Sequence, residues 1–237
     1  MNEELETLVA EGRIAEALAR VRLTGEGPRE ALEALERVRL ALRMRDAEGA
    51  RAAAAAGREA IARLVDVEEL DRALADLAEE RFEAWLEHPV VGAEAWVQKG
   101  LLDVAEGRLE AARDAFAEAA RRDRQHWRAW TNLGHAELEL GNLEAAEAAY
   151  AEAEKANENY PEVYQGQAAL EKRRGRIDRM VRLLKKAQRM RLRPREEQLP
   201  GTVLPPRRPR LGSLFSWRNR WWIWIALILL AYWWTRR

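Results

Sequence analysis

A pattern that recurs every 34 residues is the feature of this sequence that most limits its possible folds. Segments 93–126, 127–160 and 161–194 align with one another without gaps. In each segment a large aromatic residue is followed by a small residue four places later and by a glycine eleven places later. These positions are Trp96, Trp130 and Tyr164; Gly100, Gly134 and Ala168; and Gly107, Gly141 and Gly175. A repeat of this length is typical of stacked supersecondary units, each too small to bury its apolar face alone.

The second half of each segment continues the pattern with small and large residues at helical spacing. These positions are Ala112, Ala146 and Met180; Phe116, Tyr150 and Leu184; and Ala119, Ala153 and Ala187. Small residues allow two helices to approach closely, and the large residues fill the space beside them. Each glycine ends one helix in a turn that needs no Cβ atom. The pattern therefore predicts an all-α fold, an α-solenoid of stacked helix-turn-helix repeats.

The second segment, WRAWTNLGHAELELGNLEAAEAAYAEAEKANENY, resembles the tetratricopeptide repeat family, whose pattern is W-x2-L-G-x2-Y, A-x3-F and A. The departures from that pattern are Glu137 and Glu158 here, Lys99 and Arg124 in the first segment, and Ala168 and Met180 in the third. Spacing and residue size agree over all three copies, so the resemblance covers about residues 93–194.

In this family the first helices of successive units line a groove that binds segments of partner proteins. By repeat position, the resemblance places nine residues in such a groove: Val97, Leu101 and Val104; Thr131, His135 and Leu138; and Gln165, Ala169 and Lys172. Members that bind chaperones clamp a terminal carboxylate with Lys and Asn at these positions. Apolar or small residues stand at most of them here, so we do not expect that ligand class. The apolar first end of the groove favours a helical or extended apolar segment of a partner.

Residues 1–92 also read as helical hairpins, but out of register with the repeats. Gly12 divides two short apolar-periodic runs, and the GEGP motif at 25–28 is expected to precede a new helix. Gly49 is expected to divide a helix over 31–47 from the alanine-rich run that follows, and a further helix is expected at about 67–87. We interpret this region as divergent repeats, joined at 88–92 to the regular ones. Whether it continues the groove or caps it stays open.

The end of the chain has a different composition. Residues 195–212 are rich in proline and arginine and predict an extended, fairly stiff linker. Residues 221–234 hold no charge, and a helix of about 22 residues around them would measure about 33 Å, enough for a bilayer core. Aromatic residues gather at both of its ends: Trp217, Trp221, Trp222, Trp224, Tyr232, Trp233 and Trp234. Such belts favour a transmembrane anchor over 213–237, with an interfacial or re-entrant helix and a buried soluble helix as alternatives.

The charges are distributed unevenly along the chain. Residues 1–160 contain 35 acidic and 21 basic side chains, whereas residues 161–220 contain 5 acidic and 17 basic ones. Five arginines precede the apolar segment and are expected to face lipid headgroups: Arg207, Arg208, Arg210, Arg218 and Arg220. This excess predicts that the repeats stay cytoplasmic, and the arginine bias is typical of a bacterial protein, so the inner membrane is the expected location. The basic third repeat either faces anionic lipid or an acidic partner, or pairs with the acidic second repeat.

No catalytic or metal-binding pattern is found. The chain has no cysteine, and His88, His126 and His135 lack the spacing of a metal pair. We therefore expect no enzyme activity and no cofactor. The first residues are acidic and hold no apolar core, so no secretion signal is expected there.

Three hypotheses for the function remain. The first is a membrane-tethered scaffold or adaptor that binds partner proteins in the groove. The alternative is a structural or assembly subunit of a membrane complex, whose Trp-rich helix packs against other spans. The third is a soluble regulator that binds nucleic acid through residues 172–195, but no base-reading motif accompanies those basic residues, so nucleic acid is not expected. The partner and the oligomeric state cannot be inferred from these patterns.

Overall fold

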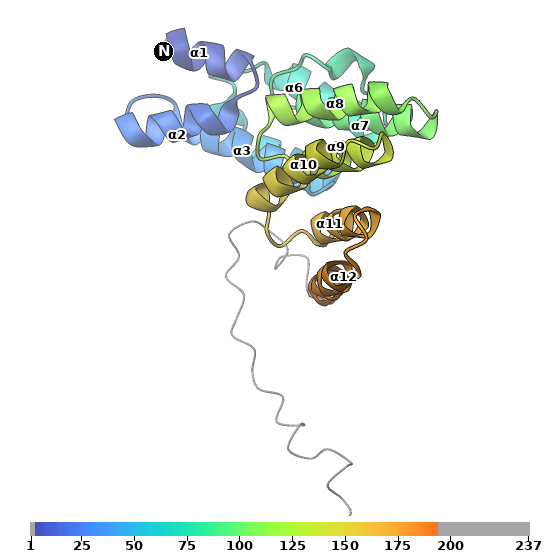
Figure 1. Cartoon of the computed structure of the whole chain (residues 1–237). Helices are drawn as coiled ribbons and strands as arrows, with labels where there is room; N and C mark the ends of the chain where they lie inside the picture. Colours follow the sequence, from blue (N-terminus) through green and yellow to red (C-terminus); the bar gives the residue numbers. More distant parts are fainter. Residues whose placement is uncertain (1–2, 194–237) are drawn as a thin grey trace, which may run out of the picture. The chain divides into compact units, whose positions relative to one another are not determined.

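A computed structural model describes residues 3–193 of the chain (Figure 1). The described residues belong to one compact unit. Over the described range the secondary structure is entirely helical. Its elements are α1 (Glu3–Ala10), α2 (Ile14–Thr24), α3 (Arg29–Arg43), α4 (Ala47–Ala56), α5 (Arg58–Ile61), α6 (Val67–Ala78), the 3-10 helix η1 (Glu83–Trp85), α7 (Gly92–Ala105), α8 (Leu109–Arg122), α9 (Trp127–Glu139), α10 (Leu143–Ala156), α11 (Pro161–Arg173) and α12 (Ile177–Arg191). The predicted all-α array of helical hairpins is confirmed for this range.

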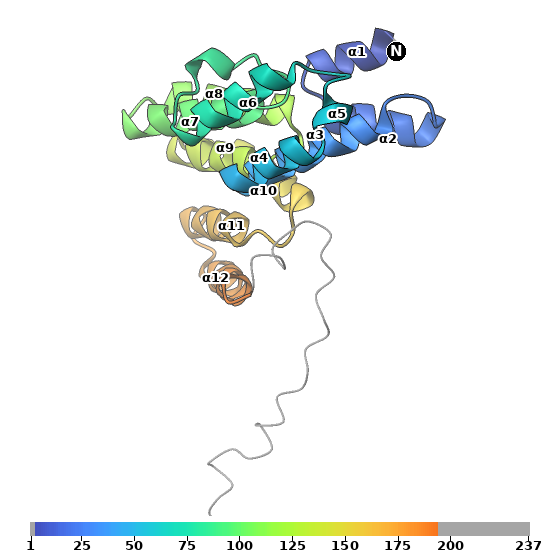
Figure 2. The ribbon, with the colours of Figure 1, turned by 180° about the vertical axis from the view of Figure 1, so that it is seen from behind.

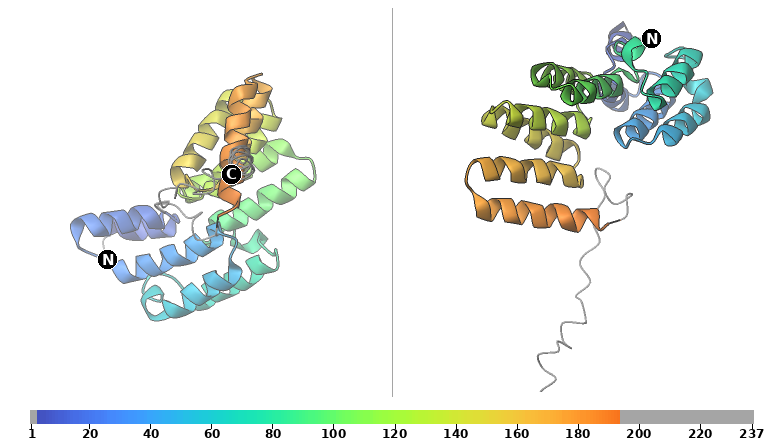
Figure 3. Two further views of the ribbon diagram at one scale, coloured as in Figure 1. Left: turned by 90° about the horizontal axis from the view of Figure 1, so that it is seen from below. Right: turned by 90° about the vertical axis from the view of Figure 1, so that its right-hand side faces the viewer.

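The three repeats form three antiparallel hairpins, α7–α8, α9–α10 and α11–α12. They stack in chain order, as the right-hand view of Figure 3 shows. The turn inside each hairpin has a glycine with positive φ: 76° at Gly107, 86° at Gly141 and 74° at Gly175. Residues with a Cβ atom rarely adopt this left-handed conformation, so the glycines set where each first helix ends. The predicted register of the repeats agrees with these turns.

Within a hairpin, close approach depends on a second glycine. A Cβ atom at Gly100 would lie 2.5 Å from Cε1 of Phe116, and one at Gly134 would lie 2.6 Å from Cε1 of Tyr150. Gly166 of the next hairpin also packs against Cε1 of the same Tyr150 ring. The ring is therefore fully buried between its own hairpin and the following one. Removing this much apolar surface from water is the main stabilising contribution that each stacking contact makes.

The N-terminal half, α1–α6, forms its own apolar cluster, which also includes Val90, Val91 and Ala95 near the start of α7. Gly12, with a φ of 73°, lies in the turn between α1 and α2, and α3 begins directly after Pro28, as predicted. The expected break at Gly49 was wrong. The chain turns at Met44–Asp46 instead, and the Asp46 carboxylate caps α4 by accepting a hydrogen bond from the Gly49 N–H at 2.8 Å.

The expected continuous helix over 67–87 was also wrong. α6 ends at Ala78, Glu80 has a φ of 60°, and only η1 follows. The Asp76 carboxylate provides the physical reason, since it accepts hydrogen bonds from Arg81 Nε at 3.0 Å and from Trp85 Nε1 at 2.9 Å. These contacts fold the chain back over the end of α6. The carbonyl of Leu77 accepts a hydrogen bond from the Glu80 N–H at 3.2 Å and a second one from Gln98 Nε2 on α7 at 3.0 Å.

Figure 2 gives the view from behind, in which α3, α4 and α6 lie on the side of the array that faces away from α10. Among residues 3–193, no helix is both long enough and apolar enough to cross a membrane. The predicted linker (195–212) and anchor (213–237), with the aromatic and arginine residues named for them, lie outside the described residues and stay predictions.

Candidate functional site

A cavity of about 570 Å³ opens between the N-terminal helices and the first helix of the first repeat. We call it the A-face hollow, because α7 and α9, the first helices of their hairpins, contribute to it. Its lining residues are Leu42, Arg45, Asp46, Ala47, Leu74, Leu77, Ala78, Glu80, Phe82, Glu83, Glu94, Gln98, Leu101, Leu102, Ala105 and Arg128. Six of these sixteen residues are charged and nine are apolar, and the volume lies in the range of sites that bind a small ligand or a peptide segment.

The apolar part of the hollow includes two partly exposed leucines of α7. Leu101 is 37% exposed and Leu102 is 43% exposed, whereas Leu77 and Phe82 opposite them are buried. The break after α6 brings Phe82 to this wall, because a helix that continued through 87 would carry the chain past α7. Arg45, Glu80 and Glu83 supply charges at the rim.

A group of buried, paired charges holds α3 in place at the edge of the hollow. Arg43 donates to both oxygens of Asp123, from Nε at 2.7 Å and from a terminal nitrogen at 2.8 Å, and Arg39 lies 3.2 Å from the same carboxylate. All three side chains are buried. Burial alone would raise the pKa of Asp123, but the charges of Arg39 and Arg43 and the hydrogen bonds from Arg43 hold that pKa far below its usual range. The contact joins α3 to the turn between α8 and α9.

A second buried group lies beside the first. Glu94 on α7 lies 3.0 Å from His126 Nε2, and a terminal nitrogen of Arg128 lies 3.1 Å from each Glu94 oxygen. The same nitrogen donates to the carbonyl of Leu42 on α3 at 3.2 Å. Burial opposes ionisation of Glu94, but Arg128 and the hydrogen bond to His126 outweigh it and lower the pKa of the carboxyl. Arg128 and Glu94 also line the hollow, so this group sets one of its polar edges.

The structure separates the predicted groove residues into two sets. Leu101, Val104, His135, Ala169 and Lys172 are exposed on the first helices, and Gln165 is half-buried with its Oε1 accepting from Arg191 at 3.0 Å. Leu101 alone of the nine lines the A-face hollow.

Val97, Thr131 and Leu138 are buried, which corrects their assignment to an open groove. Val97 packs in the apolar cluster of the first two repeats, and Leu138 packs in the cluster that contains Tyr150. The Thr131 hydroxyl donates to the carbonyl of Trp127 at 2.7 Å. His135 does not point into a site either, since its Nδ1 lies 3.0 Å from the Tyr150 hydroxyl.

The sequence patterns did not identify the buried ionic residues as members of a site. Part of this set nevertheless has a signal in the sequence. Glu94, Arg128 and Glu162 occupy the same repeat position and alternate in charge, as expected for neighbouring positions that pair across stacked hairpins. Arg39, Arg43 and Asp123 have no such signal, because they lie in regions that share no register.

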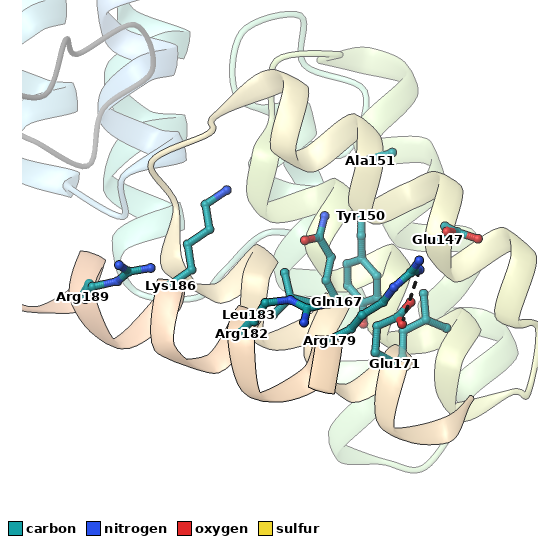
Figure 4. A pocket seen from close by; sticks show the side chains of 11 residues that line it. Glu147, Tyr150, Ala151, Gln167, Glu171, Arg179, Arg182, Leu183, Lys186 and Arg189 are labelled. Carbon is teal, nitrogen blue, oxygen red and sulfur yellow. Dashed lines mark ion pairs between the residues drawn. The ribbon is translucent and has the colours of Figure 1, made fainter. Parts of the chain in front are cut away.

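A second cavity, about 560 Å³, lies between α10, α11 and α12 (Figure 4). Tyr150, Leu170 and Leu183 supply its apolar surface, and the side chains of Arg182, Lys186 and Arg189 come from α12. The ion pair drawn in Figure 4 joins Arg179 to Glu171 at 3.9 Å.

The second repeat is acidic and the third is basic, and some of these opposite charges pair at the interface between the two repeats. Three ion pairs cross this interface: Arg173 to Glu139 at 3.3 Å, Arg174 to Glu147 at 2.8 Å, and Lys186 to Glu154 at 3.4 Å. Arg182, Lys185 and Arg189 of α12 form no ion pair with a residue of the described range. Within residues 3–193 no group of three or more acidic, histidine or cysteine side chains could hold a metal ion.

Comparison with known proteins agrees with this architecture. A family model described as tetratricopeptide repeat matches residues 97–161, which include most of the first two hairpins. A solved structure titled "Crystal structure of MamA" is 22% identical, with a TM-score of 0.42, over 62% of this chain and 89% of that one. A second, "Crystal structure of MamA protein", is 21% identical, with a TM-score of 0.41, over 75% of this chain and 98% of that one. No curated protein matches the chain.

Proposed function

We propose that this chain, which carries tetratricopeptide repeats, is a membrane-tethered scaffold that binds an apolar segment of a partner protein in the A-face hollow. The observation that carries the proposal is the pair of partly exposed leucines, Leu101 and Leu102, in a cavity of about 570 Å³. Exposed apolar side chains in a concave site lose contact with water when a partner covers them, which favours binding.

The charges around the hollow define the partner more closely. Arg45 and Arg128 lie among its lining residues together with Glu80 and Glu83, so charges of both signs surround the apolar patch. Since Arg128 is already paired with Glu94, Arg45 is the cation available to a ligand. The expected ligand is an amphipathic segment with two or more large apolar side chains and charges at its edges.

The second part of the proposal is the tether. Residues 221–234 hold no charge and are bounded by tryptophans, so we propose that they anchor the chain in the inner membrane with the repeats on the cytoplasmic side. No catalytic role is proposed. The scaffold would thus present its hollow to partners that work at the membrane surface.

Site-specific crosslinking tests the hollow. A photoreactive amino acid at Leu102 of the full chain is expected to give one discrete crosslinked product, which Leu101→Glu abolishes by placing a charge in the apolar wall. The same photoreactive residue at Leu23, an exposed leucine far from the hollow along the chain, is the matched control. Equal products from both positions, or none from position 102, would contradict the proposal.

Membrane extraction tests the tether. The full chain is expected to stay in the membrane pellet at alkaline pH, and a chain ending at residue 202 is expected to be released. Recovery of the two forms in the same fraction would contradict the anchor. Gentle detergent extraction then separates the adaptor from the alternative function, because a single large complex that depends on residues 213–237 would identify the chain as a subunit of a membrane assembly.

A further inference from the structure

The last helix of the array, α12, has an apolar face without a neighbour among the described residues. Ile177 is 53% exposed, Val181 is 37% exposed and Leu184 is 44% exposed. These residues recur at positions i, i+4 and i+7, so they form one stripe along the helix. Leu184 stands at the repeat position of Tyr150, which is fully buried between α9 and α11. We call these three residues the open stripe.

A row of cations runs beside the open stripe. Arg182, Lys185 and Arg189 recur at i, i+3 and i+7, about a third of a turn round the helix from the stripe; Arg182 and Arg189 also line the cavity between α10, α11 and α12, and all three side chains are exposed. No ion pair of these three side chains with a residue of the described range is found, in contrast to Lys186, which lies 3.4 Å from Glu154. Overall α12 has six basic side chains and one acidic one, Asp178. A helix with large apolar residues on one face and cations along its edge is typical of binding at the surface of an anionic membrane.

We infer that α12 is a lipid-binding face, which lays its open stripe against the headgroup region of an anionic bilayer while Arg182, Lys185 and Arg189 contact lipid phosphates. The inference rests on the proposed tether, which would hold α12 near the membrane. The 19 residues from 194 to 212, which join the third repeat to the proposed tether, could extend at most about 65 Å. The acidic segment 1–160 would be repelled by the same surface, so the third repeat is the part of the array that faces the lipid.

Charge argues against a second copy of the chain as the occupant of the stripe. A symmetric dimer through α12 would bring Arg182, Lys185 and Arg189 of one copy close to the same cations of the other. Like charges at such distances repel, and Asp178 is the single carboxylate of α12 that could offset its six basic side chains. An anionic lipid surface supplies counter-charges along the whole helix.

Vesicle flotation with residues 1–202 tests the inference. The apolar clusters of the described residues all lie within this fragment, so it can be tested without residues 203–237. We expect it to float with vesicles of phosphatidylglycerol and phosphatidylcholine at 50 mM salt, and to remain unbound with phosphatidylcholine alone. At 0.5 M salt the binding is expected to be lost, because the Debye length falls below about 5 Å.

Variants locate the binding face. Removing one cation near an anionic surface costs about fivefold in partitioning, so Lys185→Glu/Arg189→Glu is expected to lower partitioning by about 25-fold or more. Val181→Asp/Leu184→Asp is also expected to lower partitioning, because charged side chains replace two apolar residues of the open stripe. The matched control is Arg37→Glu/Arg63→Glu, which changes the net charge equally at two exposed arginines of the N-terminal half and is expected to have less than about a threefold effect.

Three results would overturn the inference. These are no flotation with anionic vesicles, an equal loss for the control pair, and a dimer in sedimentation analysis that Val181→Asp/Leu184→Asp dissolves. Insertion of the full chain into phosphatidylcholine vesicles reports on the tether separately. If the full chain inserts but residues 1–202 ignore anionic vesicles, the proposed function stands and the inference fails.

Discussion

The two ends of the repeat array differ in how their charges and apolar residues are covered. At the first end, α3 lies over the α8–α9 turn, and Arg39, Arg43 and Asp123 are buried and paired. At the last end, the open stripe of α12 is exposed and its cations Arg182 and Lys185 have no ion pair with a described residue. The same 34-residue unit therefore serves two purposes. Its register depends on glycines and alanines inside the hairpin, whereas its role depends on what covers its outer face.

The largest expected effect comes from removing a buried charge at the end that α3 covers. Asp123→Ala removes the carboxylate that the buried Arg39 and Arg43 share and leaves Arg43 only Glu36 as an ion-pair partner, so the free energy of unfolding of residues 1–202 is expected to fall by about 3–5 kcal/mol. Lys185→Ala at the open end is expected to change it by less than about 0.5 kcal/mol. Urea unfolding followed by circular dichroism measures both. Similar losses for the two variants would mean that the ends are equally embedded.

Close packing inside the hairpins offers a smaller contrast. Gly100→Ala places a Cβ atom against the Phe116 ring, and we expect a loss of about 1–3 kcal/mol from overpacking. The equivalent residue in the third repeat is already alanine and is buried, so Ala168→Gly is expected to cost the helix propensity of glycine and one buried methyl group, together about 1–2 kcal/mol. Thermal unfolding of the two variants makes the comparison. A neutral Gly100→Ala would show that the first hairpin can widen.

Acid should weaken the covered end first. Because the folded-state pKa of Asp123 lies below its unfolded value, the carboxylate contributes stability at pH values above about 4 and loses that contribution as pH falls toward its folded-state pKa. One such group gives a slope of up to about 1.4 kcal/mol per pH unit. Asp123→Asn is expected to show a shallower slope between pH 4 and pH 2, measured by urea titration. Parallel curves would exclude this carboxylate as a source of acid sensitivity.

The smallest expected effect concerns the open stripe itself. Leu184→Ser replaces a partly exposed leucine with a polar residue, and the free energy of unfolding of residues 1–202 is expected to change by about 0.5 kcal/mol or less. Differential scanning calorimetry at low salt is sensitive enough to compare it with the unmodified protein. A loss of about 2 kcal/mol would indicate a covered core position instead.

The hairpins of the three repeats could be predicted because their signals are local. Gly107, Gly141 and Gly175 adopt positive φ at the turns, and small residues face large ones inside each hairpin. These requirements repeat three times, so chance agreement is small. The N-terminal turns were harder, because the Asp46 cap and the Asp76 contacts that end their helices use side chains common on any helix surface.

The candidate site was predicted only in part. Leu101, Val97 and Thr131 were predicted to line one groove; Leu101 is exposed, whereas Val97 and Thr131 are buried. Periodicity indicates which face a helix presents, yet it cannot tell which neighbour covers that face. Arg39, Arg43 and Asp123 read as surface charges for the same reason, since their burial depends on contacts between residues about 80 positions apart.

Because Arg39 and Arg43 meet Asp123 only while α3 is docked on the α8–α9 turn, neither half of residues 3–193 can detach without breaking this buried ion-paired group, after which Arg43 keeps only Glu36 of its own helix. Local openings between them are therefore rare, and the backbone amides of α3 and α9 are expected to exchange hydrogen with solvent chiefly when the whole unit unfolds. α12 has no helix on its outer side among the described residues, so its amides are expected to exchange through fraying. On heating, unfolding would then begin at the third repeat, and the helices joined by the contacts of Arg39 and Arg43 with Asp123 would unfold last.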